Sequence, residues 1–261
     1  MTIKIAVVNE SKNHETRVAV VPEIAQKLAS NNVTFSIEKN SGSASGFLDS
    51  DYPEGACSFF DTHSEAIKDA DVLFKVNPPT SEEVGFMKKG ALAVSFMNPF
   101  QNGELIKNMA SSGIDAFSVE LVPRISRAQS MDALSSQASI AGYKAVILAA
   151  NNANKFFPML TTAAGTVRPA QTLIVGAGVA GLQAIATAKR LGSRVIAFDV
   201  RSSTKEQIES LGAQFLDTGI TAEGEGGYAR ELSGEELKTQ KEALSKAIGQ
   251  SDIVITTAAV P

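Results

Sequence analysis

The sequence is poor in the residues that staple a fold or bind a metal. Of its 261 residues one is cysteine, two are histidine and none is tryptophan. Because Cys57 is alone, an internal disulfide framework is excluded. A metal centre would need several carboxylates beside the two histidines, and we predict none. The net charge of −4 provides no basic field for nucleic acid, so we expect no nucleic-acid partner.

Long hydrophobic runs are also missing. No apolar stretch approaches the roughly 18 residues that a membrane span needs. The longest candidate, 141–150, is interrupted by Tyr143 and Lys144. The apolar start, 1–8, is too short for a secretory signal peptide. With 44% apolar and 20% charged residues, the composition is that of a globular protein, and we expect a soluble chain in a reducing compartment.

The first half of the chain alternates between short apolar runs and helical patterns. The runs contain almost only apolar residues, which is typical of strands buried on both faces of a parallel sheet. Alternation of this kind predicts an α/β layer architecture with right-handed crossovers. The predicted strands are 3–8, 33–37, 71–76, 91–96 and 114–119, and the predicted helices are 22–30 and 103–111.

The middle of the chain differs in composition from both sides. Residues 124–136 are polar and irregular, and an alanine-rich helix is predicted over 138–153. The stretch 161–169 consists of small residues and is typical of a connector. A second strand and helix alternation begins at Gln171, so we expect two lobes.

A glycine pattern begins this second alternation. The apolar run 173–175 is followed by Gly176, Gly178 and Gly181, and a helix is predicted over 182–191. Strand, G-x-G-x-x-G and helix form the dinucleotide-binding fingerprint. The first glycine allows a tight turn, the second leaves room for a pyrophosphate, and the third lets helix and strand pack closely. The alternative is a packing turn without a ligand.

An acidic residue ends the next predicted strand, 194–198. Asp199 follows Gly181 by 18 residues, where a carboxylate is expected to bind the ribose hydroxyls. Since this carboxylate would repel a 2′-phosphate, we expect NAD(H) to be preferred over NADP(H). Arg201 supports the rival interpretation, an arginine clamp for that phosphate. A Rossmann-like lobe without any cofactor is the remaining alternative.

Two further stretches of the second lobe face the same decision between ligand contact and plain surface. The glycine-rich stretch 219–230 carries Tyr228, which would close over a cofactor or belong to a surface loop. The strand predicted over 252–257 ends where the ligand crevice lies. The predicted cofactor-binding residues of this lobe are Gly176, Gly178, Val179, Gly181, Asp199, Val200, Arg201, Gly227, Tyr228, Thr257 and Ala258.

The predicted fold class is therefore α/β, with two Rossmann-like lobes that contain parallel sheets and are joined by a long helix. We expect a cleft between the lobes. The predicted divisions are an N-terminal lobe over 1–137, a connecting helix and linker over 138–168, and a nucleotide-binding lobe over 169–261. A complete doubly wound lobe needs further strands and a closing helix, so the second lobe is expected to be incomplete at its C-terminus.

Four stretches carry a resemblance to a known family: 124–137, 140–143, 163–166 and 176–191. Together they resemble the NAD(H)-binding first domain, in the alpha subunit, of the proton-translocating NAD(P) transhydrogenases. The resemblance runs over essentially the whole chain, and 124–136 is its most specific segment. The alanine dehydrogenases are relatives with the same two-lobe plan.

The resemblance implies an oxidoreductase of the Re/Si-specific transhydrogenase type. NAD(H) would bind here and exchange hydride with NADP(H) on a partner domain or beta subunit. A membrane proton-channel domain would couple this exchange to proton translocation. The chain would then be a homodimer on the cytoplasmic side, peripheral to the inner membrane through its partners. Activity of this chain would require those partner domains.

The resemblance also assigns residues. Arg124, Gln129, Asp132 and Ser135 correspond to the polar loop that positions the dihydronicotinamide, Arg127 joins the cofactor-binding residues, and Tyr228 matches the tyrosine of the family's mobile loop. By spacing alone, Gln129, Asp132 and Ser135 fall on one side of a helical turn, and their amide, carboxylate and hydroxyl groups suit a carboxamide. The alternative is that Asp132 caps the next helix and Arg124 is a surface charge.

Two other functions compete with this one. In alanine dehydrogenases, residues that match Arg17 and Lys75 bind the substrate, and a catalytic histidine follows the strand that here ends at Met97. This chain has Asn98 there, and asparagine cannot shuttle the proton that substrate oxidation releases. Arg17 and Lys75 then remain as structural ion-pair residues. The third possibility is a module that binds NAD(H) without turnover.

Overall fold

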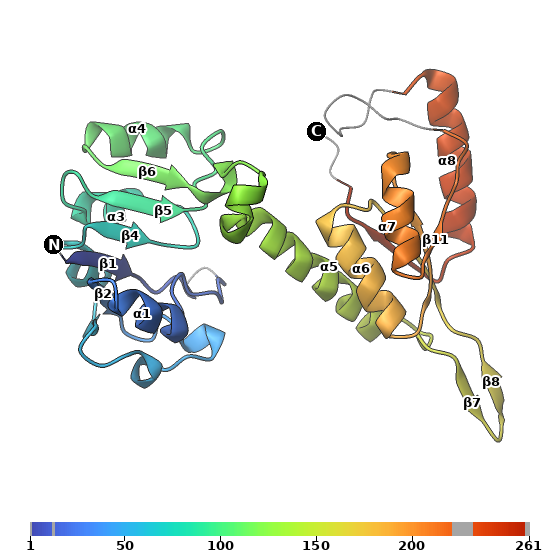
Figure 1. The fold of residues 1–261 in the computed structure, drawn as a ribbon, viewed down its shortest axis with the longest axis horizontal. Helices are drawn as coiled ribbons and strands as arrows, with labels where there is room; N and C mark the ends of the chain where they lie inside the picture. The colour runs from blue at the N-terminus through green and yellow to red at the C-terminus, as the bar shows by residue number, and fades with distance from the viewer. Residues whose placement is uncertain (1, 12–13, 221–231, 259–261) are drawn as a thin grey trace. The chain divides into compact units, whose positions relative to one another are not determined.

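The computed structural model describes residues 2–11, 14–220 and 232–258. The chain divides into two compact units, Met1–Ala133 and Leu134–Pro261, and each is described by itself. Both are α/β units built on parallel sheets (Figure 1). This confirms the predicted fold class. The division into 1–137, 138–168 and 169–261 stays a prediction.

The first unit contains a six-stranded sheet in the order β3-β2-β1-β4-β5-β6, with every neighbouring pair parallel. This is the strand order of a doubly wound nucleotide-binding fold, in which the order reverses between β1 and β4. The strands are β1 (Ile3–Val7), β2 (Val33–Glu38), β3 (Cys57–Phe60), β4 (Val72–Phe74), β5 (Leu92–Ser95) and β6 (Asp115–Ser118). The helices are α1 (Pro22–Ala29), α2 (His63–Ile67), α3 (Ser81–Phe86) and α4 (Gly103–Ser111).

Local sequence explains how these elements begin and which way their side chains face. Pro22 opens α1, where its missing N–H costs nothing. Thr80 and Glu83 form a reciprocal capping box at the start of α3. Successive strand residues point to opposite faces, so Ala6 and Val7 of β1 enter two separate buried clusters. The sheet is thus covered on both faces, as its apolar strands predict.

The second unit contains a four-stranded parallel sheet in the order β11-β10-β9-β12. The order reverses beside β9, which pairs with β10 on one side and β12 on the other. Its strands are β9 (Gln171–Val175), β10 (Arg194–Phe198), β11 (Gln214–Phe215) and β12 (Ile253–Thr256). Its helices are α5 (Ala133–Asn152), α6 (Val179–Arg190), α7 (Lys205–Ser210) and α8 (Gly234–Gly249). Ile174, Ile185 and Ala197 are fully buried in its core.

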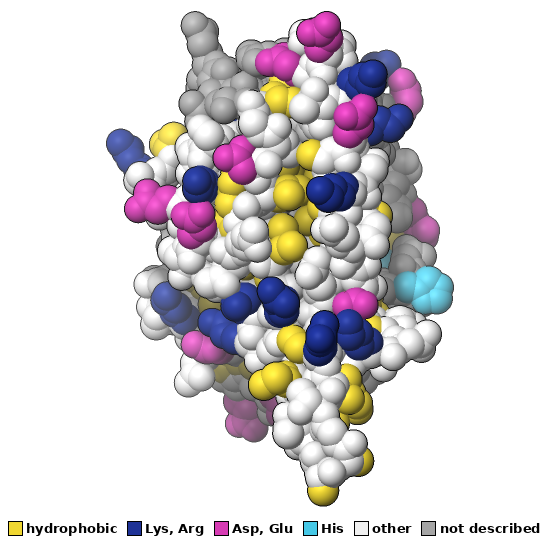
Figure 2. Space-filling model, turned by 90° about the vertical axis from the view of Figure 1, so that its right-hand side faces the viewer, with side chains coloured by type: hydrophobic (Ala, Val, Ile, Leu, Met, Phe, Trp, Pro, Cys, Tyr) yellow, Lys and Arg dark blue, Asp and Glu magenta, His cyan; other side chains and the backbone are white. Residues whose placement is uncertain are grey.

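Two predictions about the middle of the chain are wrong. The long helix begins at Ala133 rather than at 138, because the polar residues before Ala138 continue the helix instead of ending a loop. The stretch 161–169 is not an irregular connector: β7 (Leu160–Thr162) and β8 (Gly165–Val167) form an antiparallel hairpin there. Gly165, at a φ of 136°, completes the turn. The hairpin projects from the rest of the second unit (Figure 2).

Within the described ranges, none of the helices combines the length and apolar character of a bilayer-spanning segment.

Candidate functional site

The glycine turn follows β9 as the pattern predicts. Gly176 has a φ of 99°, a conformation that favours glycine. A Cβ at this position would lie 2.7 Å from the Ala258 nitrogen and 2.8 Å from Oγ1 of Thr257. The Thr257 hydroxyl donates a hydrogen bond to the Gly176 carbonyl oxygen at 3.0 Å. The end of β12 therefore packs directly on the turn, and only glycine fits.

The other two glycines of the pattern have different surroundings. A Cβ on Gly181 would lie 1.8 Å from the Gly176 carbonyl oxygen, so this glycine lets α6 approach the strand. A Cβ on Gly178 would meet no described atom within 4 Å. Gly178 is the exposed N-cap of α6, and no side chain of the described residues caps that helix. The free N–H groups of the first turn, beside exposed Val179, fit an anion such as a pyrophosphate.

A fourth glycine fixes the position of α6 and was not predicted from the sequence. A Cβ on Gly142 of α5 would lie 2.1 Å from the carbonyl oxygen of Ala180. The backbones of α5 and α6 therefore touch at the first turn of α6. Gly142 stands inside a helical pattern without a cap or turn role, which is the signal for a close approach.

Asp199 follows β10 and contacts the glycine turn. Its Oδ2 accepts a hydrogen bond from the Ala177 N–H at 2.7 Å. Its side chain is 7% exposed and is paired with Arg201, whose Nε lies 2.9 Å from Oδ1. Burial raises the pKa of Asp199, but the hydrogen bonds from Arg201 and Ala177 outweigh it and hold that pKa below its usual range. The carboxylate is thus ionised at the expected place.

The structure brings these residues together at one edge of the second sheet. The carboxyl ends of β9, β10 and β12 carry the glycine turn, Asp199 with half-buried Val200, and Thr257 with exposed Ala258. This edge includes the point beside β9 where the strand order reverses, which is where open α/β sheets bind ligands. Gly227 and Tyr228 lie outside the described residues.

The polar segment of the resemblance lies between β6 and α5. The 3₁₀ helix η5 (Ser126–Met131) contains exposed Arg127 and Gln129, and Arg124 is exposed before it. Asp132 ends η5 at a ψ of 84°, and α5 starts with the next residue. The prediction that Gln129, Asp132 and Ser135 share one helical turn is therefore wrong, because the backbone breaks at Asp132.

An apolar groove of about 550 Å³ lies beside this segment in the first unit. Among the described residues that line it, only Arg127 is charged. The other lining residues are Ala116, Phe117, Ser118, Leu121, Val122, Pro123, Ile125, Ala128 and Met131.

The carboxyl edge of the first sheet is occupied by the chain's own side chains. After β1, the Glu10 carboxylate accepts the N–H groups of Val76 at 2.7 Å and Asn77 at 2.8 Å. These amides follow β4, so Glu10 fills the position where the strand order reverses in this sheet. A ligand at this point would have to displace a carboxylate that already has its donors.

Both residues that match the alanine dehydrogenase substrate site are paired with carboxylates. Arg17 lies 2.8 Å from Glu15, and Lys75 lies 2.7 Å from buried Glu83. Burial raises the pKa of Glu83, and the charge and hydrogen bonds of Lys75 outweigh it and hold that pKa below its usual range. The structural ion pairs expected for Arg17 and Lys75 are present.

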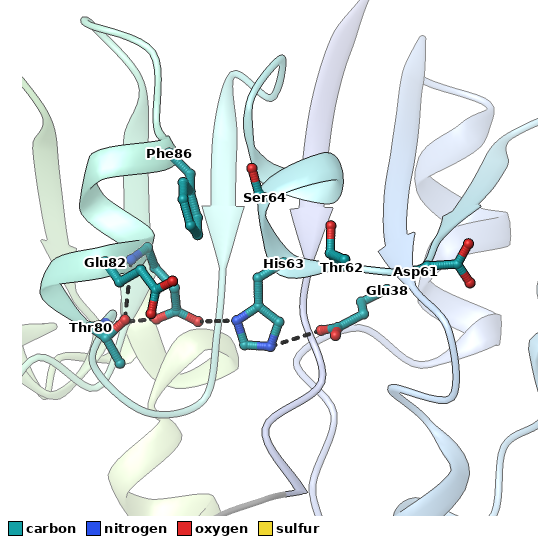
Figure 3. A pocket seen from close by; sticks show the side chains of 9 residues that line it. Glu38, Asp61, Thr62, His63, Ser64, Thr80, Glu82 and Phe86 are labelled. Atoms are coloured by element: carbon teal, nitrogen blue, oxygen red, sulfur yellow. Dashed lines mark hydrogen bonds and ion pairs between the residues drawn. The ribbon is translucent and has the colours of Figure 1, made fainter.

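A pocket of about 460 Å³ beside Glu83 shows how far this charged cluster extends (Figure 3). Nδ1 of His63 lies 3.1 Å from Oε1 of Glu83. Nε2 of His63 lies 2.9 Å from Oε2 of Glu38 but without the alignment of a hydrogen bond. These contacts between histidine and carboxylates were not predicted from the sequence. The signal for Glu83 was its place three residues after Thr80, the spacing of a capping box.

Asn98 stands at the position where the alanine dehydrogenases have their histidine. Its φ is 45°, and its side-chain Nδ2 donates to Oε1 of Gln101 at 2.7 Å. In the portion of the chain that the structure describes, no three His, Cys, Asp or Glu side chains gather as a metal ion requires.

Two family models match consecutive segments of the chain. The alanine dehydrogenase/PNT N-terminal domain matches residues 6–141. The alanine dehydrogenase/PNT C-terminal domain matches residues 145–261. Together they cover nearly the whole chain.

Individual relatives fall into two groups. The chain is 45% identical to the first portion of the NAD(P) transhydrogenase alpha subunit of Rickettsia prowazekii, over 99% of its own length and 69% of that protein. The crystal structure of a transhydrogenase from Sinorhizobium meliloti has 41% identity and a TM-score of 0.86, over 99% of this chain and 70% of that one. Alanine dehydrogenase 1 of Staphylococcus aureus is 27% identical over 98% of this chain and 65% of that protein. The chain therefore belongs to the alanine dehydrogenase/PNT family, within which it is more similar to these transhydrogenase proteins than to that alanine dehydrogenase.

Proposed function

We propose that this chain is the NAD(H)-binding component of a proton-translocating NAD(P) transhydrogenase. The observation that carries the proposal is the edge of the second sheet, where the open N-terminus of α6 at Gly178 lies next to the ionised Asp199. An anion-binding turn and a ribose-binding carboxylate are the two elements that a dinucleotide requires. The similarity to transhydrogenase alpha subunits supports the same assignment.

The cofactor fits the residues that are present. The space beside Gly178 receives a pyrophosphate, which the first-turn N–H groups of α6 would bind. Asp199 would bind the hydroxyls of the adenosine ribose, and its charge disfavours a 2′-phosphate. Thr257 and Ala258 border the same crevice from the end of β12. NAD(H), when bound, supplies a nicotinamide that exchanges hydride with NADP(H) on a partner domain.

The chain's own contribution to hydride exchange is positioning. Exchange between two nicotinamides moves no proton at the reacting carbons, so a general acid or base is not required. Geometry and exclusion of water are required instead. We assign this role to Arg124, Gln129, Asp132 and Ser135, whose donors and acceptors suit the nicotinamide carboxamide.

The remaining elements of the proposal concern partners. Proton translocation would be supplied by a membrane proton-channel domain, and the NADP(H)-binding domain or beta subunit would supply the second nicotinamide. The chain would be peripheral to the inner membrane, on the cytoplasmic side, through these partners. Exposed apolar side chains on α5 support a homodimer, since Ile140, Tyr143 and Leu148 are each at least half exposed.

The structure gives the alanine dehydrogenase alternative little support. Substrate oxidation needs free cationic groups for a carboxylate and a group that shuttles a proton. Arg17 and Lys75 are each paired with a carboxylate, and Asn98 replaces the histidine.

The test combines the chain with the NADP(H)-binding domain of a transhydrogenase, NADH and an oxidised NAD analogue. We expect hydride to pass from NADH to the analogue through the partner's NADP(H), followed by absorbance of the reduced analogue. Reduction of NAD in the presence of alanine alone would favour an alanine dehydrogenase. Binding of NADH without either reaction would favour a binding module without turnover.

Variants of the polar segment test the assigned roles. We expect Arg124→Ala and Asp132→Asn each to lower the exchange rate by about tenfold or more while the affinity for NADH changes less. Lys107→Ala is the matched control, because Lys107 is an exposed cation of the same unit whose ion pair is with Glu104. Equal exchange rates in wild type and both variants would refute the assignment.

Calorimetric titration tests the preference between cofactors. Because Asp199 is ionised, NADH is expected to bind at least about tenfold more tightly than NADPH. Comparable affinities would mean that Asp199 does not face the ribose.

A further inference from the structure

The carboxylate of Asp199 has no acceptor capacity left over. Oδ1 accepts the Arg201 backbone N–H at 2.9 Å and Nε–H at 2.9 Å. Oδ2 accepts the Ala177 N–H at 2.7 Å and the Arg201 Nη2 at 3.0 Å. An ionised carboxylate offers about four lone-pair positions, so these four hydrogen bonds fill it.

Two of the four donors belong to the backbone and are held in place. The Ala177 N–H lies in the glycine turn, which is fixed by the bond from the Gly176 N–H to the Phe198 oxygen at 2.8 Å. The backbone of Arg201 is held by Thr204, whose Oγ1 donates to the Arg201 carbonyl at 2.8 Å. These two donors cannot leave without reshaping the turn or the strand end.

The other two donors belong to the Arg201 guanidinium, which is free to move by rotation about its own side-chain bonds. The Arg201 side chain is 33% exposed, whereas that of Asp199 is 7% exposed. The guanidinium therefore covers the carboxylate from the solvent side. A ligand that approaches Asp199 meets Arg201 first.

We propose that the Arg201 guanidinium occupies the positions on Asp199 that the adenosine ribose hydroxyls take, so that NAD(H) binds only by displacing it. This inference rests on the proposed function. Displacement exchanges two charge-assisted hydrogen bonds for two bonds from neutral hydroxyls, so Arg201 lowers the affinity for NADH. The displaced guanidinium remains tethered two residues from Asp199, where it offsets the repulsion between that carboxylate and a 2′-phosphate. Arg201 thus narrows the preference for NADH over NADPH.

The test measures the binding of NADH and of NADPH to the full chain by calorimetry. In Arg201→Met the stem remains but the donors are removed, and the affinity for NADH is expected to rise about fivefold. The affinity for NADPH is expected to stay the same or fall, because the 2′-phosphate then faces Asp199 without a counter-charge. In Arg201→Lys, a single ammonium cannot form the bidentate contact, so an intermediate affinity for NADH is expected.

Arg194→Met is the matched control, since Arg194 is an exposed arginine at the opposite end of β10, and both affinities should match the wild type. Unchanged or weaker NADH binding by folded Arg201→Met, with folding verified by its thermal transition, would overturn this inference alone. An equal gain for NADH and NADPH would also overturn it, because a displaced guanidinium must treat them differently. Failure of the wild type to bind NADH would overturn the proposed function and this inference with it.

Discussion

Gly178 and Gly181 are three residues apart, yet their surroundings separate binding from folding. An added methyl group on Gly181 would overlap the Gly176 carbonyl oxygen, which is backbone and cannot move away cheaply. An added methyl group on Gly178 would meet no described atom within contact distance. The first position therefore controls how α6 packs, and the second controls what approaches its N-terminus.

We expect Gly181→Ala to lower the free energy of unfolding by about 1–3 kcal/mol, measured by urea denaturation. We expect Gly178→Ala to unfold like the wild type but to bind NADH at least about tenfold more weakly, because its methyl group enters the pyrophosphate space. Gly103→Ala is the control, since a Cβ there also meets no described atom within 4 Å and lies in the first unit. The prediction fails if Gly178→Ala loses stability and keeps its affinity.

The Glu15 carboxylate is a residue-scale source of pH dependence. The hydrogen bond from Arg17 lowers the pKa of Glu15 from its usual 4.5 to about 2, against the opposing effect of partial burial. A carboxylate with a lowered pKa stabilises the fold above its unfolded value, and that contribution is lost as pH falls through the folded value. The stabilisation is therefore complete above pH 4.5 and disappears toward pH 2.

We expect Glu15→Gln to be less stable than the wild type at neutral pH by about 0.5 kcal/mol, the scale of an exposed ion pair. The difference should shrink as pH falls from 4.5 toward about 2. Urea unfolding of both proteins across that range measures it. A difference that is constant with pH would show that Glu15 does not stabilise the fold through its charge.

At the scale of elements, Lys75 and Glu83 link β4 to α3 through a buried contact. Nζ of Lys75 lies 2.7 and 2.8 Å from the two carboxylate oxygens of Glu83. The same carboxylate accepts the Thr80 N–H at 2.6 Å and thereby caps α3. Removing Lys75 would leave a charge buried without its counter-ion, which is more costly than losing both groups.

We expect Lys75→Met to lower the free energy of unfolding by about 3–5 kcal/mol. The double variant Lys75→Met/Glu83→Gln should recover most of that loss, because its buried side chains are neutral. Lys107→Met, which breaks the exposed pair with Glu104, should cost at most about 0.5 kcal/mol. Thermal or urea unfolding of the four proteins decides this, and a Lys75→Met effect as small as that of Lys107→Met would contradict it.

Elements with strong local signals were predictable from the sequence. Strand β10 and helix α4 occur at the predicted 194–198 and 103–111, because a continuous apolar run and an amphipathic repeat are each decided within the segment. The β7–β8 hairpin was not predicted, since its strands have three residues each and it lacks an Asn-Gly or Asp-Gly turn. Helix α8 was missed although Ser233 and Glu236 form a capping box at its start.

For the candidate site, spacing predicted which residues meet but not what they already bind. Gly176 and Asp199 are assigned by their distance along the chain, and the parallel sheet brings both to one edge. The close approach of Gly142 to Ala180 depends on how two helices cross, which no short pattern encodes. The closure of Arg201 over Asp199 depends on a side-chain conformation and is invisible in the sequence.

At the scale of the whole molecule, α5 presents apolar residues that a monomer would leave in water. Ile140 is 58% exposed and Leu148 is 50% exposed. Burial of such a stripe against a second copy is favourable in proportion to its apolar area. This supports the proposed homodimer.

We expect Ile140→Glu to shift the chain from dimer to monomer in sedimentation velocity, because a carboxylate would be desolvated at the interface. Leu237→Glu is the control, since Leu237 is a similarly exposed leucine on α8 and should leave the sedimentation coefficient unchanged. A wild type that sediments as a monomer at all concentrations would rule out the dimer.

The Glu10 carboxylate determines how many dinucleotides one chain accepts. Both sheets have a strand-order reversal of the kind that serves as a binding crevice, but in the first sheet Glu10 already engages the amides of Val76 and Asn77. That lobe has, in effect, an internal ligand. The stoichiometry of NADH should consequently be one molecule per polypeptide, even at saturating concentration.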